Sequence, residues 1–173
     1  ARCAMRLNLK DIIHVPGAMR PFSFRLDLSD LEFGGARPIG RPVTVEGRVR
    51  NMAGALVLEA EAKTVLDLTC DRCARPFARE KIVPIETLLA TELADETNED
   101  EIYLLDGDEV DLDEVATTAF VLAMDSKNLC SEDCKGICAG CGADRNVEPC
   151  RCKPEVDPRL ASLAKLLEDK ESE

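Results

Sequence analysis

Aromatic side chains are scarce in this sequence of 173 residues, which has no tryptophan, one tyrosine and five phenylalanines. Proteins that hold single-stranded nucleic acid stack its bases on aromatic side chains, so the composition disfavours that mode of binding. His14 is the only histidine, and no nucleophile lies near it in the sequence. With no catalytic constellation and no phosphate-binding glycine loop, we expect a protein that is not an enzyme and has no small-molecule substrate.

Long apolar runs are also missing. A membrane-spanning helix needs about 20 consecutive apolar residues, and no segment of the chain approaches that length. The first residues do not combine a charged region with a following apolar one, so no secretory signal is visible. We therefore expect a cytoplasmic protein without a membrane partner.

Basic residues are absent between Glu92 and Glu114, where twelve acidic residues account for the whole net charge of −12. A charge block of this kind repels nucleic acid and attracts basic partners. The alternative is a solvated loop that only aids solubility. We assign residues 92–110 to an acidic flexible arm.

The first ninety residues show the alternation of half-buried β-strands. Apolar side chains occupy every second position in PFSFRLDL (21–28), and a longer alternation runs from Leu56 to Leu68. Pro84 interrupts the last run, which indicates an edge strand or a break. Short turns favour antiparallel neighbours. We therefore expect residues 1–91 to form an antiparallel sheet or a small open barrel, with a C-x-x-C sequence in one hairpin turn.

A helical period replaces the alternation at Asp111, which resembles an N-cap with Glu114 three residues later. We predict a helix over about 112–124, within a segment 111–128 packed on the sheet, with its apolar face formed by Leu112, Val115, Ala116, Ala119, Leu122 and Ala123. A second amphipathic helix with a tail is predicted at 154–173. The resulting fold class is α+β, with a cysteine-rich zinc module at 129–153 between the two helices.

Nine cysteines are present, and six of them fall within residues 130–152. Two residues between a pair of cysteines allow both sulfur atoms to face one ion, and structural zinc takes four such ligands. Eight clustered cysteines therefore predict two zinc ions. The preferred partition places Cys138, Cys141, Cys150 and Cys152 on one ion and Cys70, Cys73, Cys130 and Cys134 on the other, although swapped pairings also fit the spacing. Cys3 lies outside both groups.

Other uses of the cysteines fit the sequence less well. Disulfides suit a secreted chain with an even number of cysteines. A thioredoxin-like pair needs a βαβ context, and iron–sulfur proteins carry a C-x2-C-x2-C run that is missing here. A zinc- or redox-sensing regulator with labile metal stays open as the alternative function.

The motifs together resemble the YceD family, also called DUF177. The similarity covers roughly residues 42–167, and it is carried by LTCDRCARPF, VDLDEVATTAFVLAM, LCSEDCKGICAGCGADRN with CRC, and DPRLASLAKL. The resemblance implies a bacterial or plastid ribosome-biogenesis factor that supports accumulation of large-subunit ribosomal RNA (23S rRNA). Two positions depart from the family pattern: Met124-Asp125 replaces Leu-Pro, and Asp144-Arg145-Asn146 replaces Asn-Leu-Asn.

Binding of rRNA requires clustered positive charge to neutralise phosphates. If the fold gathers them, a basic patch centred on CDRC would contain Arg48, Arg50, Arg72, Arg75, Arg79, Lys81, Lys135, Arg145 and Arg151. Scattered solvated arginines are the alternative. The second expected partner is a basic ribosomal protein, held by the acidic arm.

Overall fold

The computed structural model describes residues 5–91 and 102–152 of the chain. Contacts divide the chain into two units. The first comprises residues 1–70 and 75–130, and the second comprises residues 71–74 and 131–173. Four residues of the C-x-x-C turn therefore belong to the same unit as the carboxy-terminal cysteines.

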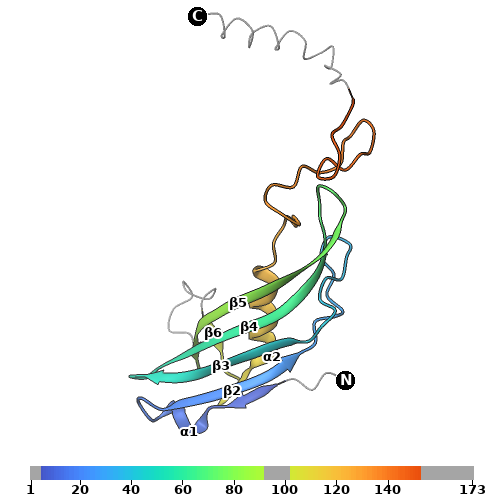
Figure 1. The fold of residues 1–173 in the computed structure, drawn as a ribbon. Helices are drawn as coiled ribbons and strands as arrows, with labels where there is room; N and C mark the ends of the chain where they lie inside the picture. Colours follow the sequence, from blue (N-terminus) through green and yellow to red (C-terminus); the bar gives the residue numbers. More distant parts are fainter. Residues whose placement is uncertain (1–4, 92–101, 153–173) are drawn as a thin grey trace, which may run out of the picture. The chain divides into compact units, whose positions relative to one another are not determined.

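The first unit holds all the named secondary-structure elements (Figure 1). In chain order they are β1 (Arg6–Asn8), α1 (Lys10–Ile13), β2 (Met19–Leu26), β3 (Val43–Met52), β4 (Ala55–Thr69), β5 (Pro76–Ala90), β6 (Ile102–Leu104), β7 (Glu109–Asp111) and α2 (Leu112–Leu122).

Five of the strands form one open sheet in the order β2-β3-β4-β5-β6. The four long strands are antiparallel, as predicted. The prediction of an all-antiparallel sheet is wrong at β6, which pairs in parallel with the last three residues of β5. Residues 91–101 connect these two strands, and a connection of that length lets the chain return in the same direction. The sheet is therefore mixed.

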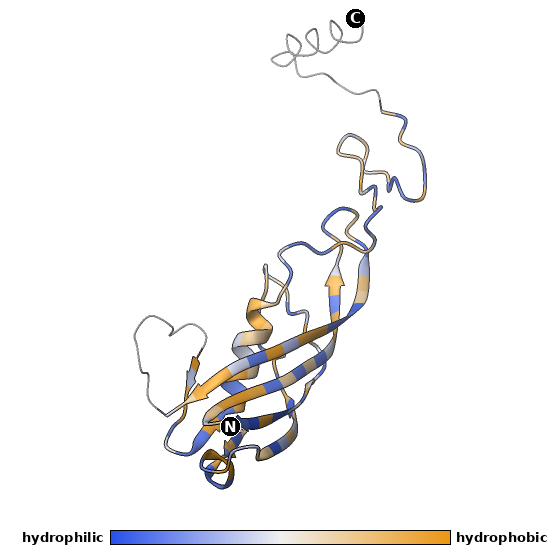
Figure 2. Ribbon diagram, turned by 90° about the vertical axis from the view of Figure 1, so that its left-hand side faces the viewer, coloured by the Kyte–Doolittle hydropathy of each residue, from blue (hydrophilic) through white to orange (hydrophobic). Residues whose placement is uncertain are grey.

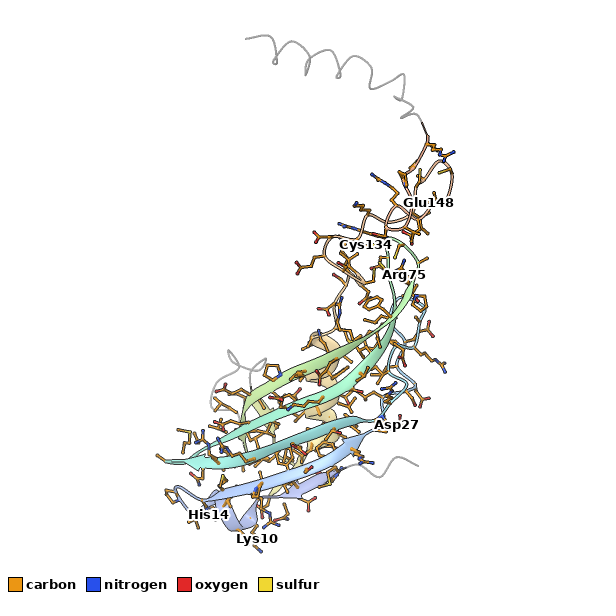
Figure 3. All side chains as sticks on the ribbon, in the orientation of Figure 1. Lys10, His14, Asp27, Arg75, Cys134 and Glu148 are labelled. Atoms are coloured by element: carbon orange, nitrogen blue, oxygen red, sulfur yellow. The ribbon has the colours of Figure 1, made fainter. Side chains whose placement is uncertain are left out.

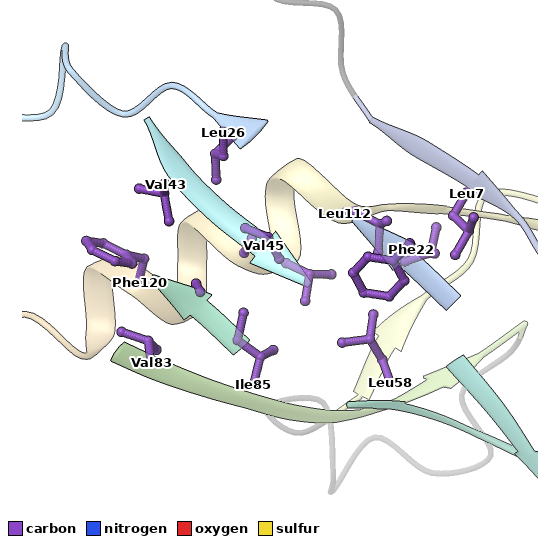
Figure 4. Packing of buried hydrophobic residues seen from close by; sticks show 14 of the residues in the cluster. Leu7, Phe22, Leu26, Val43, Val45, Leu58, Val83, Ile85, Leu112 and Phe120 are labelled. Atoms are coloured by element: carbon purple, nitrogen blue, oxygen red, sulfur yellow. The ribbon is translucent and has the colours of Figure 1, made fainter. Parts of the chain in front are cut away.

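One face of the sheet carries the hydrophobic core. Leu58 and Leu66 on β4 are almost fully buried, as are Val45 and Val49 on β3, and the strands show alternating apolar and polar bands (Figure 2). Val43, Val83 and Ile85 of the sheet belong to one hydrophobic cluster with Phe120 of α2 (Figure 4). Helix α2 thus covers the core face, and the opposite face of the sheet is polar.

Helix α2 begins at the predicted cap. The Asp111 carboxylate accepts hydrogen bonds from the backbone amides of Asp113 and Glu114, both at 3.1 Å. The predicted apolar face is wrong at its carboxy-terminal end, because Leu122 is 80% exposed and the fully buried residue is Phe120. The helix ends at Leu122. Two residues correspond to a rotation of about 200° around a helix, so Leu122 faces the side opposite to the buried Phe120.

A two-stranded antiparallel sheet of β1 and β7 was not anticipated from the sequence. It pairs Leu7 with Val110, and both are buried. Strands β6 and β7 fall within or at the end of the segment assigned to the acidic arm, so residues 102–110 are part of the fold. Residues 92–101 lie outside the described residues, as does the helix predicted at 154–173.

Pro84 lies inside β5 without breaking it. On one side Pro84 pairs with Glu61 of β4. On the other side β6 reaches only Leu88 to Ala90, so Pro84 occupies a stretch of β5 that is an edge among the described strands. Strand β5 itself lies between β4 and β6, so the predicted edge position applies only to this local stretch, and the predicted break does not occur. No helix in the described part of the chain has the length and apolar character needed to cross a membrane.

Candidate metal centres

The eight clustered cysteines come together as two groups of four. The hairpin cluster contains Cys70, Cys73, Cys130 and Cys134, and the module cluster contains Cys138, Cys141, Cys150 and Cys152. Within each group all four sulfur atoms lie within 4.8 Å of one another. This division is the partition preferred from the sequence. None of the eight is joined in a disulfide.

The hairpin cluster is largely shielded from solvent. Cys70, Cys73 and Cys134 are only 2%, 7% and 4% exposed. The turn that carries the first pair is closed by the amide of Cys70, which donates to the carbonyl of Arg75 over 2.9 Å. Ala74 has a φ of 55°, a left-handed conformation that bends the chain back towards β5.

The module cluster is built on a tight knuckle around CAGCG. The amide of Cys138 donates to Ala143, and the amide of Gly142 donates back to Cys138, over 2.8 and 2.9 Å. Gly142 has a φ of 74°, which glycine adopts without steric cost, so a glycine directly after Cys141 suits the turn of the knuckle. A side chain at Gly140 would lie 3.2 Å from the sulfur of Cys152.

One sulfur–sulfur distance in the module cluster matches that of a tetrahedral zinc site, and a second is shorter. Zinc–sulfur bonds of about 2.3 Å in a tetrahedron place the sulfur atoms about 3.8 Å apart. The sulfurs of Cys141 and Cys150 are 3.7 Å apart, and those of Cys150 and Cys138 are 3.1 Å apart. Cys141 and Cys152 are exposed, so this cluster is more open than the hairpin cluster.

Hydrogen bonds among these thiols shift their pKa values in opposite directions. The thiol of Cys150, followed by the amides of Cys141 and Gly140, lowers the pKa of Cys138 to about 6. Hydrogen bonds with Cys141 and then Cys150 raise the pKa of Cys152 to about 12. One thiolate is thus stabilised at the expense of its neighbours. A divalent cation removes this conflict because it favours the thiolate form of every ligand.

Asn146 and Gly136, which are not among the predicted site residues, shape the surroundings of Cys134. Asn146 donates from Nδ2 to the Cys134 sulfur over 3.5 Å and accepts from the Lys135 amide over 2.8 Å. Gly136 has a φ of 72°, and a Cβ there would lie 2.9 Å from the carbonyl oxygen of Arg72. Hydrogen bonds to ligand atoms orient them for metal binding. Within Asp144-Arg145-Asn146, Asn146 is the position that keeps the residue of the family pattern, and this was the signal that could have pointed to it.

Arg72 was predicted to contact rRNA, and the structure places it inside the second unit. Its Nη1 donates to the carbonyl of Cys134 over 2.8 Å, and its own carbonyl accepts from the amide of Ile137 over 2.9 Å. Arg72 therefore connects the C-x-x-C turn to the cysteine-rich module. Figure 3 shows the side chains of this module, with Cys134 and Glu148 labelled.

Arg48 and Arg50 lie on the polar face of the sheet, where both side chains bind Glu59. Arg48 donates from Nε over 2.9 Å, and Arg50 donates from Nη2. Arg48 pairs with Glu59 of β4, which lies ten residues before Thr69, the last residue of that strand. Ten residues of a β-strand span roughly 33 Å. The structure does not bring these two arginines to the end of the sheet where the hairpin turn begins.

Arg79 and Lys81 have partners within the first unit. Arg79 donates to the carbonyl of Leu129 and lies over the ring of Phe77 at 5.2 Å. Lys81, whose side chain is 15% exposed, is 3.0 Å from the carboxylate of Asp125. These contacts hold the segment after α2 against β5. Asp125 is also one of the positions that depart from the family pattern.

Four other predicted rRNA contacts are exposed. Arg75 lies in the first unit, and Lys135, Arg145 and Arg151 lie in the second. A phosphate-binding role for any of the nine basic residues stays a prediction, and the structure leaves the exposed ones as its best candidates.

The model of the family described as "Large ribosomal RNA subunit accumulation protein YceD" matches residues 58–167 of this chain. The chain belongs to the YceD family. That match includes both groups of cysteines and helix α2. The family name describes an accumulation factor rather than a catalyst.

Two curated relatives of this YceD chain were found. It is 29% identical over 189 residues to "Large ribosomal RNA subunit accumulation protein YCED homolog 1, chloroplastic" of Zea mays, covering 91% of this chain and 64% of the relative. It is 26% identical over 134 residues to an uncharacterised protein of Mycobacterium leprae (strain TN), covering 74% of this chain and 60% of that protein. The chain thus spans about three fifths of the length of these relatives. No solved structure matches it.

Proposed function

We propose that this YceD chain is a non-enzymatic zinc protein of ribosome biogenesis that supports accumulation or processing of 23S rRNA. It acts by binding rRNA, a basic ribosomal protein, or both. The observation that carries the proposal is the convergence of eight cysteines into two groups of four within a segment that matches a family named for rRNA accumulation. A cytoplasmic location is part of the proposal.

The zinc ions would supply structure rather than chemistry. A site with four thiolates leaves no position for water, and structural zinc contributes on the order of 10–16 kcal/mol of apparent binding free energy in small peptides. The module has no named helix or strand between residues 131 and 152, so ligand bonds are its main source of order. When they bind zinc, the cysteines of the module cluster would fix the positions of the exposed Arg145 and Arg151, which lie between them in the sequence.

Replacement of the endogenous protein by a Cys138→Ser/Cys141→Ser variant tests this function. We expect a lower ratio of mature 23S to 16S rRNA, together with loss of one zinc ion from the purified protein. A Cys3→Ser variant is the matched control, since Cys3 lies outside both groups. A normal rRNA ratio in cells that contain only the zinc-deficient variant would contradict the proposal.

Charge favours a basic protein as the direct partner. The described residues of the second unit carry four basic side chains against five acidic ones: Arg72, Lys135, Arg145 and Arg151 against Asp71, Glu132, Asp133, Asp144 and Glu148. Each zinc ion with four thiolates adds two further negative charges. Phosphates are repelled by such a surface and basic proteins are attracted.

Crosslinking in cells distinguishes the two partners. An Arg145→Glu/Arg151→Glu variant would lose crosslinks to 23S rRNA if these exposed arginines contact phosphates. Under the protein-partner hypothesis the variant keeps its crosslinks to a basic ribosomal protein and its rRNA ratio. A charge-preserving pair of changes, Arg145→Lys/Arg151→Lys, controls for loss of the guanidinium hydrogen bonds.

A zinc- or redox-sensing regulator is the second candidate, and the exposure of Cys141 and Cys152 favours it. Accessible thiolates are the ones that oxidise and release metal. Native mass spectrometry after mild oxidant separates the candidates. Retention of two zinc ions supports the structural role, whereas loss of zinc with a disulfide among these cysteines supports the sensor.

A further inference from the structure

A groove of about 720 Å³ lies in the first unit beside strand β5. Residues 84–88 of β5 form its floor. Thr118 and Leu122 of α2 line one side, and side chains from the polar face of β3 and β4 line the other, among them Met52, Val57 and Glu59. Strand β5 therefore separates two walls of different character, one helical and one on the outer face of the sheet.

The floor of the groove is an open sheet edge. Strand β5 is 15 residues long, and β6 pairs with it only at Leu88, Leu89 and Ala90. Among the described residues, the preceding part of β5 has β4 on one side and no strand on the other. Open edges bind extended peptides through backbone hydrogen bonds. Pro84 removes only its own amide from this edge.

Exposed apolar side chains surround the edge. Met52, Leu88 and Leu122 are 53%, 43% and 80% exposed, and all three line the groove. Side chains of an added strand alternate between the two sides of the sheet. One set would meet Leu122 of α2, and the other would meet Leu88 and Met52.

The outer wall carries two neighbouring glutamates, Glu59 and Glu86, beside Arg50. Glu59 and Glu86 are directly opposite each other on neighbouring strands, and like charges in this position destabilise a sheet. Arg48 and Arg50 both bind Glu59. Within the described ranges Glu86 has no ion-pair partner, and a basic side chain arriving in the groove would supply one.

We propose that the open edge of β5 binds an extended, basic and partly apolar segment of a partner protein, which adds to the sheet as a strand. The proposal rests on the proposed function in one respect, namely that the direct partner is a basic protein. Backbone pairing along residues 82–87 provides affinity. Glu86 and the apolar walls select for alternating basic and apolar side chains.

The test uses the full-length zinc-loaded protein and a fluorescent octapeptide of alternating lysine and valine. An octapeptide of alternating glutamate and valine is the control probe. We expect binding of the lysine peptide only, with slower amide hydrogen exchange at residues 82–87. Leu122→Lys and Glu86→Lys should each weaken binding about tenfold, which is about 1.4 kcal/mol. Met19→Lys at the opposite sheet edge, where Met19 is 51% exposed, should leave binding unchanged.

Three results would overturn the inference. The first is binding that does not depend on β5, seen either as equal affinity of the Met19→Lys and Leu122→Lys variants for the peptide or as binding without slower amide exchange at residues 82–87. The second is tighter binding after residues 92–101 are replaced by a glycine–serine linker, because the chain's own segment would then be the occupant. The third is a dimer in sedimentation that Leu122→Lys dissociates. If the peptide fails but the protein still captures a basic ribosomal protein in cells, the groove inference falls and the proposed function stands.

Discussion

Arg72 donates from its guanidinium to the backbone carbonyl of Cys134, 2.8 Å away. The same arginine accepts from Ile137 and lies against Gly136, whose missing side chain makes the approach feasible. An exposed arginine next to a cysteine in the sequence thus has a structural explanation that does not involve RNA.

Arg72→Ala should weaken zinc binding by about tenfold to a hundredfold, the range seen when a group that supports metal ligands is removed. Competition with a chromogenic chelator measures this effect, and Arg151→Ala is the control because Arg151 is exposed and makes no such contact. Unchanged zinc affinity with lost crosslinks to rRNA would instead identify Arg72 as a phosphate contact.

Chelator should remove the two zinc ions in sequence. The module cluster should release its ion first, because Cys141 and Cys152 are exposed whereas three of the four cysteines of the hairpin cluster are buried. Native mass spectrometry during incubation with EDTA would show species with two, one and no zinc ions. Alkylation mapping identifies the cysteines that react first, and early modification of Cys70 or Cys73 would contradict the order.

Phe120→Ala should cost about 3–5 kcal/mol of unfolding free energy, the usual loss for a buried phenylalanine. Leu122→Ala, two residues further on, should change it by no more than about 0.5 kcal/mol because this side chain is 80% exposed. Urea unfolding of the zinc-loaded protein measures both values. A larger loss for Leu122→Ala would show that the helix packs in the register first expected from its sequence.

The loss of folding stability at acid pH should depend in part on Glu59. Hydrogen bonds from Arg48 and then Arg50 lower the pKa of Glu59 below its ordinary value of 4.5. A depressed folded-state pKa gives a stabilisation that is complete above the unfolded pKa and is lost as the pH falls through the folded pKa. Urea midpoints between pH 3 and pH 7 should therefore decline less steeply in Glu59→Gln than in the wild type. Parallel curves for the two proteins would exclude this contribution.

Patterns of local origin were predictable. Alternation in the four long strands, the Asp111 cap and the glycine after Cys141 all follow from dihedral preferences and from the side-chain period, which neighbouring residues determine. The two groups of cysteines could likewise be proposed from spacing, because short loops bring paired sulfurs to one ion.

Long-range relationships needed the tertiary structure. Nothing in the local sequence indicates that β6 pairs in parallel with β5, or that β1 meets β7 a hundred residues later, because such pairings are decided by which apolar surfaces the whole chain can bury together. The same holds for Arg79 and Lys81, whose partners Leu129 and Asp125 lie more than forty residues further along the chain. The sequence by itself determined the strands, the helix cap and the donor atoms for metal. The folded chain alone decided which charges are neutralised internally and which edge of the sheet is left open, since both depend on groups that are distant in sequence and adjacent in space.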